Sequence, residues 1–296
     1  MSDWSNGCAV ITGGGSGIGA ALARHAATLG MNVVLADIAV EEAQAVADEI
    51  GVDRAIALRC DVSSEADVTA LADAAEARFG RVGVLCNNAG IVPGGRHRRV
   101  WEYTENDWQW SLGVNLGGVL NGMRVFVPRL LAAEAPAHIM NTASVAGLVS
   151  GSGSACYGAA KHAVVRATEA LYAGLQEMEA AIGVTLLLPG LVATRIYDAE
   201  RSRPQALAGP DGPPSESAAL EAMRDDLYRG ALTAEQTATI AFDAIRQNRF
   251  YATTTDAFDP AIRARADAIL SRANPHFESI VDMSRKDAGL AVTSAG

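Results

Sequence analysis

Six short apolar runs alternate with longer helix-forming stretches over the first two thirds of the chain. Near-continuous apolar strands are typical of a parallel sheet covered by helices on both faces, because both sides of every strand are then buried. Repeated strand, helix, strand units with right-handed crossovers give a doubly wound α/β sheet, whose ligand lies beyond the carboxyl ends of the strands. The six runs are Cys8–Thr12, Asn32–Asp37, Ala55–Asp61, Val82–Asn88, His138–Ser144 and Gly183–Gly190.

Helix signals lie between and after these runs. Ile18–Leu29 and Glu65–Arg78 are rich in alanine, and Ser63 or Ser64 is available to cap the second stretch. Thr233–Gln236 has the pattern of a capping box that opens a further helix. These patterns fit helices that connect or follow the strands.

The part of the chain after the sixth run divides into three pieces. Residues 195–230 are discussed below. Residues 231–281 predict a helix to about Asn248, a strand at Phe250–Thr255 and a helix at Pro260–Ala273. Residues 282–296 carry few apolar anchors, so we expect a frayed tail. We therefore expect residues 1–296 to form a single domain with a sheet of about seven strands.

Residues 195–230 interrupt the alternation of strands and helices. Arg203–Ser217 is rich in proline, glycine and serine and follows the sixth run closely. The apolar side chains of this segment can close over a substrate, which predicts a lid. The alternative is a surface insertion with no part in binding. The apolar residues are Leu207, Leu220, Met223 and Leu227.

The composition excludes several classes of partner. With 49% hydrophobic residues, the 296-residue chain can bury a large core. A formal net charge of −10 argues against nucleic acid or an anionic membrane, both of which need a basic face. The local basic stretch Gly95–Arg99 is interpreted as a solvated loop. No apolar run approaches the roughly 18 residues that cross a bilayer.

Location and metal content follow from two further features. Residues 1–7, MSDWSNG, do not have the pattern of a signal peptide, so we expect a cytoplasmic protein. The four cysteines have no C-x-x-C spacing, and three lie in apolar runs, so they are interpreted as buried small hydrophobic residues. We expect no metal site. The cysteines are Cys8, Cys60, Cys86 and Cys156.

A glycine-rich turn, TGGGSGIG at Thr12–Gly19, ends the first run and opens directly into a helix. Such glycines allow a tight turn and let backbone N–H groups approach a pyrophosphate at the helix N-terminus, where the helix dipole favours negative charge. A glycine-rich string can also be a simple turn. Its position between the first strand and the first helix favours a dinucleotide site.

Asp37 ends the second run, where a carboxylate can accept hydrogen bonds from both hydroxyls of an adenosine ribose. The alternative is a solvated acid after a strand. No basic residue follows before Arg54, and the glycine-rich turn contains none. A 2′-phosphate would therefore meet a carboxylate and no cation, and we expect NAD in preference to NADP.

One of the two lysines in the chain lies four residues after a tyrosine. Tyr157 and Lys161 belong to the helical stretch SACYGAAKHAVVR, whereas 22 of the 24 basic residues are arginine. Residues four apart share a helix face, and a nearby ammonium favours phenolate and lowers the pKa of a phenol. Ser144 adds a hydroxyl that can hold a substrate oxygen. The alternative is a buried tyrosine with a lysine whose stem covers apolar surface.

These motifs, in this order, resemble the short-chain dehydrogenase/reductase family over about Gly7–Thr194. The resemblance implies a Rossmann-type fold and a catalytic tetrad of Asn115, Ser144, Tyr157 and Lys161, in which Asn115 holds a water. It also implies cofactor contacts from the glycine-rich turn, the second strand, Asp61-Val62, NNAG and PGLVAT, as well as from Tyr157 and Lys161. These contacts are Gly13, Ser16, Gly17, Ile18, Gly19, Asp37, Asp61, Val62, Asn88, Ala89, Gly90, Pro189, Val192 and Thr194.

A second resemblance concerns the substrate. Gly113–Arg129 and the extra C-terminal strand and helix are similar to a branch that oxidises benzylic alcohols in lignin-derived aryl ethers. Room at Gly94, Gly95 and Ser150–Ala155, with apolar residues nearby, fits a bulky apolar or aromatic substrate. The apolar residues expected to line the site are Val145, Leu148 and Leu191, whereas Trp108 and Trp110 are assigned to packing.

We therefore expect an NAD-dependent enzyme that interconverts a secondary alcohol and its ketone by hydride transfer. Tyr157 would exchange the hydroxyl proton, Ser144 would hold the oxygen, and Lys161 would hold the ribose and adjust the phenol. The resemblance also implies a homo-oligomer, a tetramer or a dimer. The alternatives are a non-catalytic dinucleotide-binding sensor or scaffold on the same fold, and a related epimerase or dehydratase.

Overall fold

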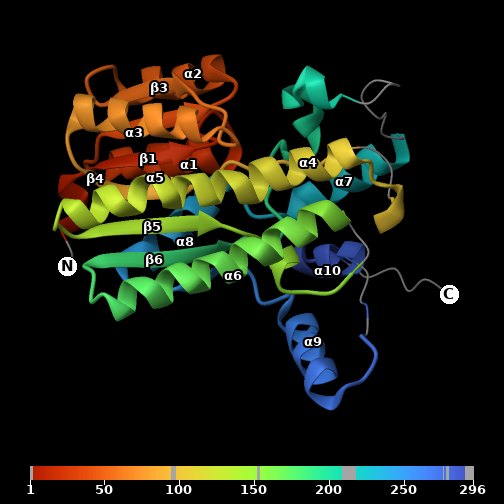
Figure 1. Cartoon of the computed structure of the whole chain (residues 1–296). Coiled ribbons are helices and arrows are strands. Elements are labelled where there is room, and N and C mark those ends of the chain that lie inside the picture. Colours follow the sequence, from red (N-terminus) through yellow and green to blue (C-terminus); the bar gives the residue numbers. More distant parts are fainter. Residues whose placement is uncertain are drawn as a thin grey trace.

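The computed structural model describes residues 3–94, 98–151, 154–208, 218–275, 277 and 280–290. Within these ranges, seven parallel strands form one sheet in the order β3-β2-β1-β4-β5-β6-β7 (Figure 1). The predicted doubly wound sheet is confirmed. The strands are β1 (Cys8–Thr12), β2 (Val33–Asp37), β3 (Ala55–Arg59), β4 (Val82–Asn87), β5 (Ala137–Thr142), β6 (Ile182–Leu188) and β7 (Tyr251–Thr253).

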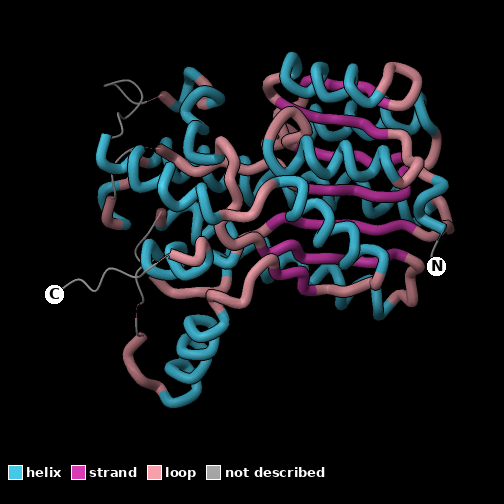
Figure 2. The backbone as a smooth tube through the Cα atoms, turned by 180° about the vertical axis from the view of Figure 1, so that it is seen from behind, coloured by secondary structure: helices cyan, strands magenta, loops and turns pink. Residues whose placement is uncertain are grey.

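Helices cover both faces of the sheet (Figures 1 and 2). The reason is visible in β1, where Ala9 and Ile11 belong to one apolar cluster while Cys8 and Val10 belong to another. The first cluster includes α1 (Gly17–Thr28), α2 (Val40–Ile50) and α8 (Ala234–Arg246), and the second includes α3 (Glu65–Phe79), α5 (Gly118–Ala132) and α6 (Ala155–Glu177).

The strand order reverses next to β1, because β2 and β3 lie on one side of it and β4 to β7 on the other. Loops at the carboxyl ends of β1 and β4 therefore leave in opposite directions and open a crevice between them. This crevice is where a doubly wound sheet binds its ligand. All the motifs singled out in the sequence lie at or near this edge.

Two predicted helix starts are confirmed. Ser64 caps α3, where its Oγ accepts a hydrogen bond from the Asp67 backbone N at 3.2 Å. Thr233 caps α8 and forms a capping box with Gln236, whose Oε1 accepts from the Thr233 backbone N at 2.8 Å. Each cap satisfies backbone N–H groups that a helix terminus leaves unpaired.

The remaining elements surround the carboxyl edge of the sheet and extend beyond it. In Figure 1, α9 (Asp259–Ser271) stands away from the sheet. No helix of the described residues is long and apolar enough to cross a membrane. The other elements are α4 (Glu105–Leu112), α7 (Ala218–Gly230), α10 (Ile280–Asp287), the π-helical turn η3 (Gly113–Gly117) and the 3₁₀ turns η1 (Asp3–Asn6), η2 (Val100–Glu102), η4 (Val145–Gly147), η5 (Ile196–Ser202) and η6 (Gln205–Leu207).

The predicted frayed tail is wrong for its described part. Residues 280–287 form α10, and Met283 is 1% exposed in a cluster with Val145, Val149 and Phe258. Asp287 Oδ2 also accepts a hydrogen bond from the Leu191 backbone N at 2.6 Å. Met283 and Asp287 both fasten this helix, although the sequence has few apolar residues here. Residues 291–296 lie outside the described residues.

Other expectations lie partly outside the described residues as well. Residues 209–217 of the predicted lid, residues 95–97 of the basic stretch and residues 152–153 of the Ser150–Ala155 stretch are in this group. The four cysteines are free and buried, as their apolar surroundings predict. Ser144 lies two residues beyond β5 and caps η4, so the expected strand was two residues too long at this end.

Candidate active site

A cavity of about 1950 Å³ opens at the carboxyl edge of the sheet. Three of the four expected catalytic residues and most expected cofactor residues line it, although they come from distant parts of the chain. Asn115 and Gly19 do not line the cavity. The expected residues that do are Gly13, Ser16, Gly17, Ile18, Asp37, Asp61, Val62, Asn88, Ala89, Gly90, Ser144, Tyr157, Lys161, Pro189, Val192 and Thr194.

The glycine-rich turn has no room for side chains at its critical positions. A Cβ on Gly19 would lie 1.9 Å from the Gly13 carbonyl oxygen, and one on Gly13 would lie 2.9 Å from the Ala89 Cα. Gly13 and Gly17 also have positive φ values of 64° and 51°, which side chains disfavour. The turn leads into α1, so its backbone offers a narrow cradle at a helix N-terminus. This shape and the absence of side chains fit a dinucleotide pyrophosphate.

Asp37 lies at the end of β2 and supports the same turn. Its Oδ2 accepts a hydrogen bond from the Gly15 backbone N at 2.9 Å, and its Oδ1 accepts from the Ala39 backbone N at 3.0 Å. A carboxylate has about four acceptor positions, so two remain for ribose hydroxyls. Asp37 also lines the cavity, which fits a residue that holds an adenosine ribose.

Asp61 and Val62 lie beyond β3 on the wall of the same cavity. Asp61 Oδ1 accepts hydrogen bonds from Ser63, from the backbone N at 3.0 Å and from Oγ at 2.7 Å. Val62 is buried, and a Cβ on Gly118 would lie 2.7 Å from its Cγ2. The pair therefore presents a carboxylate beside a fixed apolar side chain, a surface that suits an adenine ring.

Asn88 ties three strands together at the floor of the cavity. Its Nδ2 donates to the Thr12 carbonyl oxygen at 3.1 Å, and its Oδ1 accepts from Thr142 Oγ1 at 3.2 Å. The backbone N–H groups of Asn88 and Ala89 both donate to Thr12 Oγ1, at 2.9 and 3.1 Å. The side chain of Asn88 is therefore engaged within the protein, and it shapes the cofactor crevice between β1 and β4.

Ser144 and Tyr157 lie beside each other on the opposite wall. Ser144 Oγ accepts a hydrogen bond from the Ala146 backbone N at 3.1 Å. Burial raises the pKa of Tyr157 to about 12, and a hydrogen bond with Ser144 opposes this change. The serine hydroxyl and the tyrosine phenol thus share one small region of the cavity, where a substrate oxygen can contact both.

Lys161 shares a helix face with Tyr157, as the spacing predicts. Its Nζ donates to the Thr142 carbonyl oxygen at 2.8 Å and lies 5.6 Å from the centroid of the Tyr157 ring. The lysine is 2% exposed, and burial lowers its pKa to about 8. In this arrangement burial dominates the pKa of Tyr157, and the expected lowering of that pKa by the Lys161 ammonium stays a prediction.

Asn115 lies behind the cavity in the π-helical turn η3, a distortion that is frequent at functional sites. Its Nδ2 donates to the carbonyl oxygens of Ile91 at 2.9 Å and Ser111 at 3.0 Å, and its Oδ1 accepts from the Ile91 backbone N at 2.9 Å. A Cβ on Gly90 would lie 3.0 Å from Asn115 Oδ1 and 3.5 Å from Lys161 Nζ. Glycine at position 90 therefore lets the asparagine and the lysine approach each other.

The PGLVAT motif brings the chain back to the glycine-rich turn. The Pro189 carbonyl oxygen accepts a hydrogen bond from the Val145 backbone N at 3.0 Å, and Val192 pairs with Leu232 in an isolated bridge. A Cβ on Gly17 would lie 3.1 Å from Thr194 Cγ2. The motif therefore packs against the glycine-rich turn and lines the same cavity.

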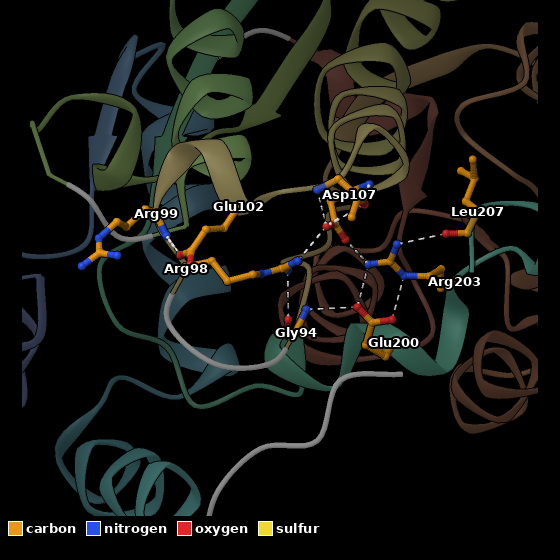
Figure 3. A network of polar contacts seen from close by, with 9 residues as sticks. Gly94, Arg98, Arg99, Glu102, Asp107, Glu200, Arg203 and Leu207 are labelled. Atoms are coloured by element: carbon orange, nitrogen blue, oxygen red, sulfur yellow. Dashed lines mark hydrogen bonds and ion pairs between the residues drawn. The ribbon is translucent and has the colours of Figure 1, made fainter. Parts of the chain in front are cut away.

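A network of four charged side chains, for which the sequence gives no signal, lies beside the cavity, and Arg203 of this network lines it (Figure 3). Arg203 donates to Asp107 Oδ1 from Nη2 and to Glu200 Oε2 from Nε, both at 2.7 Å. Arg98 Nη1 donates to Asp107 Oδ2 at 2.7 Å. These side chains are at most 15% exposed, so the charges are largely removed from water.

Aromatic rings flank the same network. The Arg203 guanidinium lies 4.3 Å from the centroid of Trp110, and that of Arg98 lies 4.2 Å from the centroid of Tyr103. Trp110 is buried against Ile91 and Ala199, which confirms its packing role, and it also lines the cavity. Sequence spacing gives no signal for such contacts, because Asp107 and Arg203 are 96 positions apart.

The apolar lining agrees with expectation except at one residue. Val145 and Leu191 line the cavity, as do Leu207, Met223 and Leu227 from the region of the expected lid. Leu148 instead packs against the cluster of Val164, Leu186 and their neighbours. It follows the 3₁₀ turn η4 rather than a strand, so its side chain turns toward the core.

Known proteins resemble the chain over most of its length. Residues 7–205 match the family model described as short chain dehydrogenase. A CLA biosynthesis dehydrogenase/reductase from Lactiplantibacillus plantarum is 32% identical over 93% of this chain and 97% of its own. A C alpha-dehydrogenase from Sphingobium sp. strain SYK-6 is 30% identical over 95% of this chain and 88% of its own.

A solved structure resembles the fold still more closely. The crystal structure of a short chain dehydrogenase/reductase from Burkholderia phymatum, in complex with NAD, is 42% identical and covers 94% of this chain and 99% of its own, with a TM-score of 0.86. The match in sequence extends over the strands that carry the crevice, and the match in structure extends over nearly the whole molecule. The chain belongs to the short-chain dehydrogenase/reductase family.

Proposed function

We propose that this protein uses NAD(H) to interconvert a secondary alcohol and its ketone, with Asn115, Ser144, Tyr157 and Lys161 as its catalytic tetrad. The observation that carries the proposal is the shared cavity. Ser144, Tyr157 and Lys161 face the same space as the glycine-rich turn and Asp37. A substrate oxygen beside the phenol would then lie within reach of a nicotinamide held along the crevice.

When bound, the nicotinamide supplies hydride chemistry at its C4 atom. Tyr157 exchanges a proton with the substrate oxygen, as general acid for a ketone and as general base for an alcohol. A phenol whose pKa is raised to about 12 keeps its proton in the free protein, so it is prepared to donate to a ketone. Ser144 donates a hydrogen bond to the same oxygen and fixes its position.

Lys161 has a positioning and electrostatic role in this proposal. Its ammonium is held by the Thr142 carbonyl at 2.8 Å, below the crevice where the nicotinamide ribose would lie. A compact ammonium can donate to ribose hydroxyls and favours phenolate when the alcohol is oxidised. Asn115 holds the neighbouring backbone at Ile91 and lies close to Lys161 across Gly90, where it would order a water that leads protons away.

The preference for NAD over NADP rests on Asp37. Its two free acceptor positions suit the ribose hydroxyls, while its negative charge opposes a 2′-phosphate. The NAD complex of the Burkholderia relative supports the same cofactor.

The substrate is proposed to be bulky and apolar or aromatic. Beyond Ser144 and Tyr157, the residues that line the cavity include the aromatic residues Tyr103, Trp110 and Phe258 and the apolar residues Val145 and Leu191. One of the relatives named above is a C alpha-dehydrogenase.

We propose that residues 195–230 act as a lid on this substrate site. Leu207, Met223 and Leu227 face the cavity, as a closing surface requires. Limited proteolysis tests the proposal. Cleavage within this region should be slower with NADH and an inert ketone analogue than without them, while the sheet stays resistant in both cases. Equal cleavage rates would leave the region as a surface insertion.

We also propose a cytoplasmic homo-oligomer, a tetramer in solution. Exposed apolar side chains lie on three helices, with Leu120 on α5, Tyr172 on α6, and Ile269 and Leu270 on α9. Apolar surface of this kind is typical of contacts between subunits. Light scattering after gel filtration tests the state, and a monomeric mass would contradict it.

The decisive experiment is a screen for NADH formation over aliphatic and aromatic secondary alcohols, with variants of the tetrad. Tyr157→Phe should bind NADH almost normally and lose at least about a hundredfold in turnover, the scale of general acid/base catalysis. Lys161→Arg should be similarly impaired, because the larger guanidinium does not fit the buried position. Binding of NADH without turnover on any alcohol or ketone would favour a non-catalytic sensor instead.

A further inference from the structure

We propose that Glu42 is a second determinant of cofactor choice, because it neutralises two arginines that would otherwise accept a 2′-phosphate. The inference rests on the proposed NAD(H) function and concerns the adenosine end of the same crevice. The sequence predicts that a 2′-phosphate meets no cation, because no basic residue lies near Asp37 along the chain. The structure differs, since Arg195 and Arg201 reach this end from a part of the chain more than 150 positions away.

Glu42 is the meeting point of the two arginines. It lies in the first turn of α2, and its Oε2 forms an ion pair with Nη2 of Arg195. Its Oε1 lies 4.0 Å from Nε of Arg201. The arginines come from the segment after β6, so the contact spans the mouth of the crevice between α2 and that segment. All three residues line the cavity.

The position of this contact places it at the ribose site. A Cβ on Gly15 would lie 3.0 Å from Asp37 Oδ2 and equally 3.0 Å from Glu42 Cβ. The two acids therefore flank the same glycine of the cofactor turn. Thr194, next to Arg195, faces Gly17 of that turn. Glu42, which holds the two guanidinium groups, therefore lies beside the same turn as Asp37, the carboxylate that would receive the ribose hydroxyls.

The two acids have different partners in this proposal. Asp37 remains available for the ribose hydroxyls, while Glu42 forms ion pairs with the two arginines. Removal of the Glu42 carboxylate would leave two guanidinium groups at the mouth without this partner, and guanidinium is well suited to bind phosphate through paired N–H donors. The chain therefore contains a latent site for a 2′-phosphate, which Glu42 keeps closed.

A simpler explanation is that Glu42 only stabilises α2. Glu41 and Glu42 both lie in the first turn of that helix, where acidic side chains interact favourably with the helix dipole. An exposed ion pair such as Glu42 with Arg195 adds little to stability, so its loss should leave the fold intact. Glu41 shares the helix position but does not line the cavity, which makes Glu41→Gln a matched control.

The test compares Glu42→Gln, Glu41→Gln and wild type by direct binding. Dissociation constants are measured for NADPH and NADH by nicotinamide fluorescence, and for 2′,5′-ADP and 5′-AMP by calorimetry, with melting temperatures as a check of folding. In Glu42→Gln, NADPH and 2′,5′-ADP should bind about tenfold more tightly, the scale of one charge-assisted contact, while NADH and 5′-AMP change little. Glu41→Gln should match wild type.

A second set of variants tests whether the two arginines cause the gain in NADPH affinity. In a variant with Arg195→Gln and Arg201→Gln, the additional change Glu42→Gln should give no gain in NADPH affinity. A gain that persists there, an equal gain in Glu41→Gln, or no gain in Glu42→Gln would each overturn the proposal. Failure of the wild-type protein to bind NADH would instead overturn the proposed function, so the two outcomes are distinguishable.

Discussion

Two regions of the molecule are held together in different ways. The cofactor region, residues 7–190, is a set of short strands and helices whose site is formed by backbone turns at the ends of neighbouring strands. The closing region, residues 191–290, adds α8 and β7 to the core and the sheet, and its other described parts are fastened by individual long-range contacts, such as Arg203 with Asp107 and Asp287 with the Leu191 backbone. The site of the first region depends on close backbone approach, whereas the parts of the second region around the cavity depend on particular charged side chains.

The largest effect is expected at a glycine of the cofactor region that has no room for a side chain. In Gly19→Ala, the new Cβ would lie 1.9 Å from the Gly13 carbonyl oxygen, so the turn has to move. We expect a loss of about 4 kcal/mol or more in stability and no measurable NADH binding. Unfolding in urea and NADH fluorescence measure both quantities.

The control for this change is Gly174→Ala in α6, where a Cβ would have no neighbour within 4 Å. Alanine is favoured over glycine within a helix by up to about 1 kcal/mol, so this variant should be slightly more stable than wild type. Near-normal NADH binding by Gly19→Ala would show that the turn adapts, and the contrast between the two regions would fail.

The second prediction concerns the charged network of the closing region. Arg203→Met leaves Asp107 and Glu200 buried with a cation removed, and we expect about 3 kcal/mol lower stability. Trp110 would also lose the guanidinium that stacks on its ring. KM for the substrate should therefore rise about tenfold, while NADH affinity stays nearly constant.

A matched control lies in the cofactor region. Arg24→Met removes the ion pair with Glu49, whose side chains are 42% and 56% exposed. Exposed pairs contribute at most about 1 kcal/mol, so stability and kinetics should hardly change. An equally small effect of Arg203→Met would mean that the closing region does not depend on its buried charges.

The contrast between the regions explains what the sequence could predict. The strands, both capped helices and the cavity-lining motifs follow from local patterns, because apolar periodicity, Ser64, Thr233 and the glycines act within a few residues of their own positions. The tetrad could be assigned through family spacing, although the buried state of Lys161 could not be. Its pKa depends on packing from several elements.

The other features of the fold and the site depend on long-range contacts, which local sequence patterns do not predict. The pairing of Asp107 with Arg203 and of Glu42 with Arg195 joins positions far apart in the chain, among many other charged residues. The segment expected to fray instead forms α10, in which Met283 is buried in a cluster with Phe258. Such fits are decided by three-dimensional shape rather than by composition.

The third prediction concerns an exception in the cofactor region, the buried charge of Lys161. Burial lowers its pKa to about 8 from an ordinary value of 10.5. Between these values the unfolded chain binds more protons than the folded one, so stability rises with pH. The cost of burying the charge is fully present below pH 8 and is relieved as the pH rises toward 10.5.

Lys161→Met removes this dependence. From neutral pH to pH 10.5, the stability of wild type relative to Lys161→Met should rise by up to about 3 kcal/mol. Tyr157 titrates in both proteins and therefore largely cancels in the difference. Urea unfolding of both proteins at several pH values measures the slope. If the stability difference between the two proteins does not vary with pH, burial does not destabilise the charged form of Lys161.

The smallest effects are expected at the helix caps, where the two regions should behave alike. Ser64→Ala removes the cap of α3 in the cofactor region, and Thr233→Ala removes the cap of α8 in the closing region. Each should lower the free energy of unfolding by about 1 kcal/mol, because one backbone N–H loses its partner. Thr69→Ala, on the exposed surface of α3, is the control and should change stability by less than about 0.5 kcal/mol. If Thr233→Ala lowers the free energy of unfolding much more than Ser64→Ala does, the two capping signals are not equivalent. The closing region would then depend on α8 to hold its long-range contacts in place.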